Sequence, residues 1–218
     1  DVMALCRTGA EVDAAAAQHK TAALLSIEGA DLLDCDMAPL ETAASWGVRL
    51  LNPVWNNANA LCGSCAREPE RGLSARGVEF VARMEELGIH TDVSHISDAG
   101  FWDVLRRAKR PVTASHSNSR EPGLCPHRRN LTDDMFRAIR DTGGVVGLNV
   151  HHAFVHADPA LQTAEMLARH AAHMAEVVGI EHVACGFDFC EYFGPGNEGA
   201  EGLENCAQIK NLFYWLEK

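Results

Sequence analysis

The order of elements along the sequence predicts an α/β fold built on a parallel sheet. Short strand-like apolar segments alternate with helical segments, and no two strands are joined by a hairpin signal. The chain has 218 residues, of which 47% are hydrophobic and 22% are charged, so it can form one sizeable domain with a substantial core.

The first third of the chain predicts two helices, two strands and a long loop. An alanine-rich stretch at 9–20 is typical of a helix, and the apolar run at 22–27 is typical of a short strand. A second helix is predicted at 37–47 and a second strand at 48–54. The polar segment 56–72 contains Gly and Pro, which indicates a loop.

The alternation continues through the middle of the chain. Residues 73–88 place apolar side chains at helical spacing and end in glycine, so we predict a helix there and a strand at 89–94. The segment 98–110 predicts another helix, with Asp98 as its N-cap and basic residues in its last turn. A fourth strand is predicted at 111–115.

The last third of the chain predicts two more helices and two more strands. Thr132 is the expected N-cap of a helix within 131–143, and the apolar segment 144–149 is the next strand. A long helix at 160–179 and a strand at 182–187 complete six strands in all.

Acidic or imidazole side chains stand at the ends of four of these strands. Glu28 follows the first strand, His95 the third, His116 the fourth and Asp188 the sixth. Because the carboxyl ends of parallel strands open onto one face, we expect these four side chains to meet there. Two neutral imidazoles with carboxylates suit zinc or a related divalent ion. We therefore predict a metal site in which the nitrogens of the two histidines lie about 3–4 Å apart, as ligands of one zinc ion.

The other histidines are weaker candidates for ligands. His170 and His173 lie three residues apart on the long predicted helix, and we interpret them as packing or capping residues. His151 and His152 follow a strand and could line the pocket, although nothing marks them as ligands. His127 lies in a loop, where exposure to solvent is the simpler interpretation.

A basic pair, Arg128 and Arg129, lies in the loop that leaves the His116 strand. Such a pair before a helix is usually a solvated turn. This loop, however, leaves the predicted site face, where a guanidinium can hold a carboxylate through two hydrogen bonds.

Composition argues against several classes of partner. The formal net charge of −11 argues against nucleic acid, because phosphate binding needs a basic face. No segment approaches transmembrane length and the first residues do not resemble a signal peptide, so we expect no membrane partner. Eight irregularly spaced cysteines favour free thiols in a reducing compartment, and we expect a cytoplasmic protein. Cys62 and Cys65 form a single CxxC, which alone is weak evidence for zinc or redox chemistry.

Six motifs give the sequence a resemblance to a known family. They run in order through nearly the whole chain as SIEGA, GVRLLNPVWNNANAL, GLSARGVEFVARMEELGIHTDVSHIS, PVTASHSNSR, RRNLTDD and VGIEHVACGFDF. Together they resemble the membrane (renal-type) dipeptidases, the M19 metallopeptidases. The resemblance implies a TIM-type (β/α)8 barrel with a binuclear zinc site that cleaves dipeptides.

The resemblance also implies roles for individual residues. Glu28 matches the carboxylate that bridges the two metals, and His95 and His116 match the histidines of the second metal. Asp188 matches an aspartate near the first metal that acts in proton transfer. Arg129 matches the arginine that holds the free carboxylate of the substrate.

The sequence departs from the family pattern in two places. The family's first barrel strand carries a His-x-Asp pair for the first metal, and no such pair precedes Glu28. We therefore expect residues 1–218 to form a single metallo-dependent hydrolase barrel domain, truncated at the N-terminus and with about six of the eight strands. Trp55 stands where many members have a substrate-binding histidine, and we assign Trp55 and Asn56 to substrate binding.

These expectations combine into a zinc-dependent dipeptidase that acts on dipeptides through a metal-activated water. We expect one firmly held zinc ion and a second held weakly, because the first-metal site would keep only Glu28 and Asp188. Missing strands would leave unpaired edges, so a homodimer is expected. Two other functions stay open: a non-catalytic or weakly active remnant that binds a metal or small ligand, and a redox or structural-zinc protein built on Cys62 and Cys65.

Overall fold

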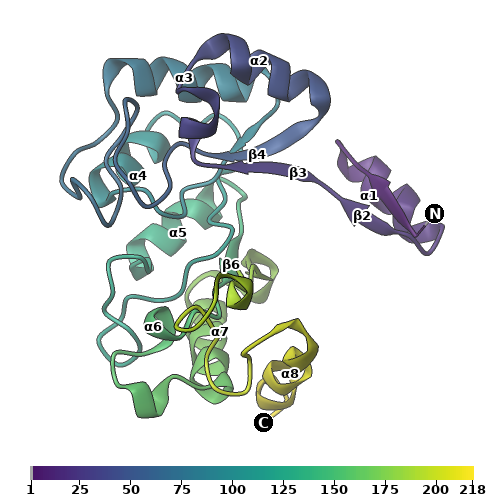
Figure 1. Ribbon diagram of the computed structural model, residues 1–218, viewed down its shortest axis with the longest axis vertical. Coiled ribbons are helices and arrows are strands. Elements are labelled where there is room, and N and C mark those ends of the chain that lie inside the picture. The colour runs from purple at the N-terminus through teal and green to yellow at the C-terminus, as the bar shows by residue number, and fades with distance from the viewer. Residues whose placement is uncertain (1) are drawn as a thin grey trace. The chain divides into compact units, whose positions relative to one another are not determined.

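The computed structural model describes residues 2–218, which contain seven strands and eight α-helices (Figure 1). The strands are β1 (Met3–Leu5), β2 (Thr21–Ala23), β3 (Leu25–Glu28), β4 (Val48–Asn52), β5 (His90–Thr91), β6 (Val146–Leu148) and β7 (Val183–Cys185). The α-helices are α1 (Gly9–Ala17), α2 (Met37–Trp46), α3 (Ala75–Glu86), α4 (Asp98–Leu105), α5 (Asp133–Asp141), α6 (His152–Val155), α7 (Ala164–Val178) and α8 (Lys210–Leu216). The 3-10 helices are η1 (Ala30–Leu33), η2 (Pro159–Leu161), η3 (Ile180–His182), η4 (Glu191–Phe193) and η5 (Cys206–Gln208).

Every ladder between the named strands is parallel, which confirms the predicted α/β class. The sheets have the orders β1-β2, β3-β4-β5 and β6-β7, and within residues 2–218 none of them closes into a barrel. The chain divides into two compact units, Asp1–Arg110 and Pro111–Lys218.

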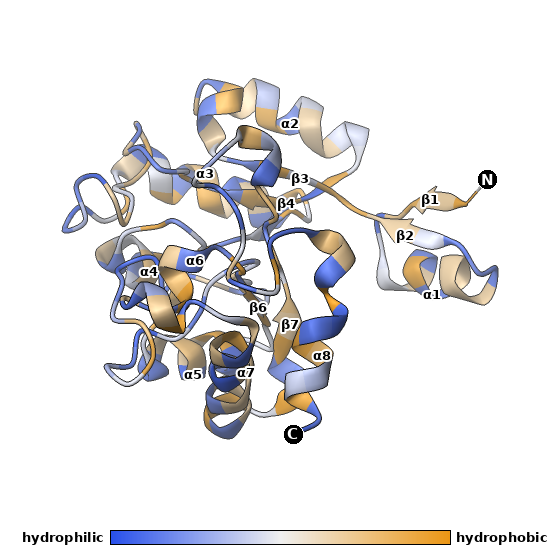
Figure 2. Cartoon of the chain, turned by 60° about the horizontal axis from the view of Figure 1, so that its bottom comes forward, coloured by the Kyte–Doolittle hydropathy of each residue, from blue (hydrophilic) through white to orange (hydrophobic). Residues whose placement is uncertain are grey.

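The first unit is centred on the sheet β3-β4-β5. Helices α2 and α3 pack against β4 and β5, and Figure 1 shows both helices beside the sheet. Figure 2 shows β3 and β4 mostly in the orange of hydrophobic residues, whereas α2 carries orange and blue residues, as expected for a helix with one buried face. Leu51, Phe80 and Met84 are fully buried in this unit.

Two details of the first unit differ from the sequence prediction. The predicted strand 22–27 is two strands, because β2 pairs with β1 while β3 pairs with β4. Asp98 is not the N-cap of α4; Ser97 is, because its Oγ accepts a hydrogen bond from the Gly100 N–H at 2.9 Å.

In the second unit α7 packs against the pair β6-β7, and α5 packs against α7. Thr132 caps α5, as predicted, and accepts a hydrogen bond from the Met135 N–H. The segment predicted as a strand at 111–115 makes only an isolated parallel bridge, between Ala114 and Val146. The sequence did not predict α6 or α8. Among the described residues, no helix has both the length and the apolar composition needed to cross a membrane.

Candidate metal centre

The first unit brings two of the predicted ligands together. Glu28 is the last residue of β3, and His95 lies four residues beyond the end of β5. The parallel pairing β3-β4-β5 carries both segments to the carboxyl end of one sheet. Glu28 Oε1 lies 2.9 Å from His95 Nε2, and the imidazole is buried while the carboxylate is 41% exposed. Within this unit the structure therefore brings two of the predicted ligands into contact.

Asn56 fixes the orientation of the His95 ring. Its Oδ1 lies 3.1 Å from His95 Nδ1, so the neutral imidazole donates its proton to the amide oxygen. That tautomer leaves the Nε2 lone pair directed at Glu28 Oε1. Two acceptor atoms facing each other at this distance are satisfied by a cation, or by a second proton on the imidazole. A hydrogen bond to the non-ligating nitrogen is also the usual arrangement around a metal-binding histidine.

Two of the predicted site residues have left-handed backbone conformations. His95 has φ +70° and Asp188 has φ +62°. For a residue other than glycine this conformation carries a free-energy cost, and such residues gather at functional sites.

A cavity of about 610 Å³ opens beside Glu28. Trp55, which is 45% exposed, forms one wall with Ile27 and Leu32. Gly29 permits this wall, since it has φ +90° and a Cβ there would lie 3.2 Å from the Cβ of Trp55. The cavity thus combines an indole surface with a carboxylate at the end of a strand.

The second unit holds the other predicted ligands. Ser117 N–H donates to Gly147 O at 2.7 Å, and this pairing places His116 beside the carboxyl end of β6. His116 Nε2 lies 3.9 Å from Asp188 Oδ2, and the His116 Nδ1 lies 2.6 Å from the hydroxyl of Ser115. The two strand-end residues of this unit therefore also converge.

Asn149 is a buried site residue that the sequence analysis missed. Its Nδ2 donates to Asp188 Oδ2 at 3.1 Å, and its Oδ1 accepts from the His151 N–H at 2.7 Å. The side chain thus holds the Asp188 carboxylate from one side and the start of the next loop from the other. Its position at the end of the predicted strand 144–149 was the available signal.

Arg129 is buried, with 3% exposure, rather than solvated. Its Nη1 donates to the Ser117 Oγ at 2.8 Å, and its Cζ lies 5.8 Å from the centre of the Phe154 ring. Ser117 is the residue after His116, so the guanidinium lies in the neighbourhood of that predicted ligand. Burial lowers the pKa of His127, and the positive charge of Arg129 lowers it further.

Two of the remaining histidines, His170 and His173, make contacts inside the second unit. His170 is fully buried, accepts from the Ser119 N–H at 3.1 Å and lies 2.8 Å from Val155 O. The prediction that it is a packing residue is confirmed. His173 lies 2.7 Å from Asp133 Oδ1 and links α7 to α5.

The CxxC does not form a disulfide, and none of the eight cysteines in residues 2–218 does. Cys62 is buried and its Sγ lies 3.9 Å from the Ser97 Oγ. Burial raises the pKa of the Cys62 thiol to about 11, which keeps it protonated near neutral pH. Thiolate is the form that binds metals and attacks disulfides, so this pKa argues against the redox hypothesis.

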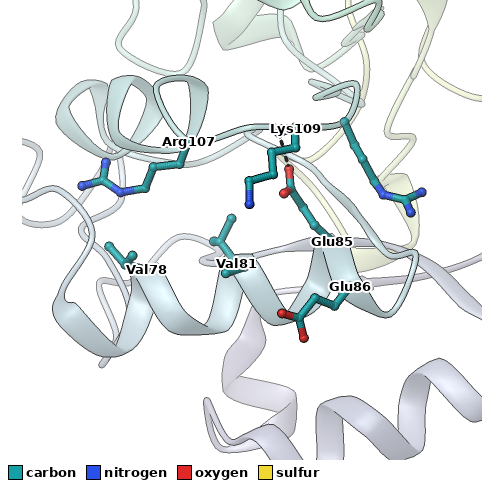
Figure 3. Close-up of a pocket in the computed structure, with 8 residues that line it drawn as sticks. Val78, Val81, Glu85, Glu86, Arg107 and Lys109 are labelled. Atoms are coloured by element: carbon teal, nitrogen blue, oxygen red, sulfur yellow. Dashed lines mark hydrogen bonds between the residues drawn. The ribbon is translucent and has the colours of Figure 1, made fainter.

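A separate cavity of about 640 Å³ contains none of the predicted site residues (Figure 3). Val78 and Val81 of α3 lie on one side of it, and Arg107 and Lys109 lie on the other. The backbone N–H of Lys109 donates to Glu85 Oε1 at 2.9 Å, so a hydrogen bond connects the two sides of this cavity.

The sequence model of the membrane dipeptidase family, peptidase family M19, matches residues 1–218. The chain belongs to this family. It is 37% identical over 194 residues to an uncharacterized protein in the pqqA 5′ region of Klebsiella pneumoniae, covering 85% of this chain and 71% of that protein. It is 35% identical over 203 residues to an uncharacterized dipeptidase of Schizosaccharomyces pombe, covering 88% of this chain and 46% of that protein.

The fold of this M19 chain matches that of a solved structure. A metallo peptidase from Rhodobacter sphaeroides, liganded with a phosphinate mimic of the dipeptide L-Ala-D-Ala, matches with a TM-score of 0.86 at 31% identity. The match covers 99% of this chain and 62% of that protein. The fold prediction is thereby confirmed, and the chain spans less than two thirds of that relative.

Proposed function

We propose that this M19 chain is a zinc-dependent dipeptidase, with Glu28, His95 and His116 as the ligands of one firmly held zinc ion and with Glu28 and Asp188 as the remaining ligands of a second, weakly held one. The observation that carries the proposal is the pair formed by Glu28 Oε1 and His95 Nε2, 2.9 Å apart with the proton of His95 directed to Asn56. His116 and Asp188 form a second imidazole–carboxylate pair. A mixed set of imidazole and carboxylate ligands is typical of catalytic zinc.

Zinc held by these residues would acidify a water molecule and polarise the scissile carbonyl. The protein's own groups have separate tasks. Asp188, held by Asn149, would carry a proton from the attacking water to the leaving amine. Arg129 would hold the C-terminal carboxylate of the substrate, which restricts the reaction to very short peptides. Trp55 and Asn56 would bind the rest of the dipeptide beside Glu28.

Two relatives support this function by their own descriptions. One is described as a dipeptidase, and the Rhodobacter sphaeroides metallo peptidase holds a phosphinate mimic of a dipeptide. For this chain we propose the same class of ligand, a dipeptide with free ends, and about one firmly held zinc ion.

The test measures zinc content and turnover on the same protein. Protein purified without chelator is analysed for metal and is then assayed on alanine dipeptides of both C-terminal configurations. We expect about one zinc per chain, loss of zinc in Glu28→Gln and His95→Asn, and no loss in Cys62→Ser. Zinc binding without hydrolysis would support the non-catalytic alternative, and zinc loss in Cys62→Ser would overturn the proposed ligand set. Light scattering on the same sample tests the predicted homodimer.

A further inference from the structure

His151 lies in the segment that follows β6, and it has no role in the proposed mechanism. It lies in the second unit, immediately before α6, and its ring stacks on Phe154 with 4.6 Å between the ring centres. Arg129 Cζ lies 5.8 Å from the centre of the same Phe154 ring. The imidazole and the guanidinium therefore both lie against the same phenyl ring.

A second contact connects His151 to Asp188. The Asn149 amide accepts from the His151 N–H at 2.7 Å and donates to Asp188 Oδ2 at 3.1 Å. His151 is thus linked through Asn149 to Asp188, the proposed proton carrier, and through Phe154 to Arg129, the proposed carboxylate-binding residue. A dipeptide that reached from one to the other would pass beside this imidazole.

The hydrogen bonding of the His151 ring defines its tautomer. Its Nδ1 accepts from the Ala153 N–H at 3.3 Å, so in the neutral ring the proton is on Nε2. Burial lowers the pKa of His151, with His152 as the next contributor, so the ring is neutral near pH 7. Among residues 2–218 no acceptor takes the Nε2–H, which makes it a donor available to a ligand.

His152 shows that this availability is particular to His151. The two rings stack with 4.7 Å between their centres. Both nitrogens of His152, however, are engaged by the protein, since Nδ1 lies 3.0 Å from Gln162 Oε1 and Nε2 lies 3.4 Å from Gly196 O. His152 therefore offers a matched control with a similar position and no donor to spare.

We propose that His151 binds the substrate, donating its Nε2–H to the carboxylate of the C-terminal residue beside Arg129. This inference rests on the proposed dipeptidase function. A carboxylate accepts about four hydrogen bonds, and a guanidinium supplies at most two in the forked arrangement. A neutral N–H donor fills a third position without adding a second positive charge to the site.

The experiment measures binding, so that it does not depend on turnover. The probes are a phosphinate dipeptide mimic with a free C-terminal carboxylate and the same mimic with a C-terminal amide, titrated by calorimetry into the zinc-loaded protein. His151→Phe keeps a stacked ring without the donor, and His151→Gln restores an N–H near the Nε2 position. We expect His151→Phe to weaken binding of the acid about tenfold, with little effect on the amide. His151→Gln should recover most of the loss, and His152→Phe should bind the acid like the unaltered protein.

Histidine NMR of the unaltered protein keeps the test valid where His151→Phe does not fold. The acid mimic should shift and protect one imidazole Nε2–H signal, which is absent from the spectrum of His151→Gln. Equal weakening for acid and amide, or no response of that signal, would overturn the assignment of His151. Binding that behaves as expected without any dipeptide hydrolysis would instead overturn the proposed activity and leave His151 as a ligand-binding residue. Failure of the unaltered protein to bind the acid mimic would overturn both.

Discussion

Replacing His170 should reduce the acid sensitivity of the folded protein by a measurable amount. His170 is fully buried between the Ser119 N–H and the carbonyl of Val155, and burial lowers its pKa from 6.5 to about 4. Between those pH values His170 binds a proton in the unfolded chain but not in the folded chain. Stability from this residue is therefore complete above about pH 6.5 and falls as the pH falls toward 4.

The size of the effect follows from the same two pKa values. At about 1.4 kcal/mol for each pH unit, the lowered pKa of His170 corresponds to about 3 kcal/mol between pH 7.5 and pH 4. His170→Asn can keep an acceptor for the Ser119 N–H, but it leaves the Val155 carbonyl without its donor. That loss should cost about 1–3 kcal/mol at pH 7.5.

The assay is urea unfolding followed by circular dichroism at several pH values from 7.5 to 4.5. We expect the unaltered protein to be the more stable at pH 7.5 and the two curves to approach each other by about 2 kcal/mol near pH 5. The difference between the curves isolates His170, because both proteins share every other titrating group. Parallel curves over this range would refute the reasoning.

Three further predictions concern the site. Arg129→Ala should raise KM for a dipeptide about tenfold or more through loss of a charge-assisted hydrogen bond, while a C-terminally amidated analogue should be little affected; equal losses on both would point to a structural role. Asn149→Ala should lower kcat more than it raises KM, because the Asp188 carboxylate loses the donor at 3.1 Å; steady-state kinetics that show an unchanged kcat would contradict this. The Cys62 thiol, with its pKa raised to about 11 by burial, should resist alkylation at pH 7.5 until urea is added, and the double variant Cys62→Ser/Cys65→Ser should keep its zinc. Rapid alkylation of Cys62 in the folded protein, detected by mass spectrometry, would contradict its buried position.

The strand-end rule predicted which side chains come together, because it depends on topology rather than on side-chain detail. A parallel sheet carries the ends of its strands to one edge, so Glu28 and His95 meet although they lie far apart in sequence. Asn149 follows the same rule but was overlooked, since an amide is a weaker signal of metal chemistry than a carboxylate. Asn56 was expected to bind substrate, and its contact with His95 Nδ1 depends on how a long loop folds, which no local pattern encodes.

The errors in the fold have equally specific causes. Strands β1 and β2 have three residues each, too few for an alternating pattern to be recognised. The boundary between β2 and β3 is a change of partner strand, which the continuous apolar run in the sequence conceals. Ser97 and Asp98 are both good N-cap residues, and only the hydrogen bond to the Gly100 N–H decides between them.

The left-handed backbone at His95 and Asp188 has a consequence for how this family can change over time. Each position holds a proposed site residue in a backbone conformation that glycine adopts at lower cost, so the proposed role is obtained at some loss of stability. A gene copy released from selection for activity would therefore gain stability by accepting glycine at either position, while the rest of the fold stayed intact. Among relatives, glycine at the positions equivalent to 95 and 188 should therefore identify proteins that retain the fold but lack the activity.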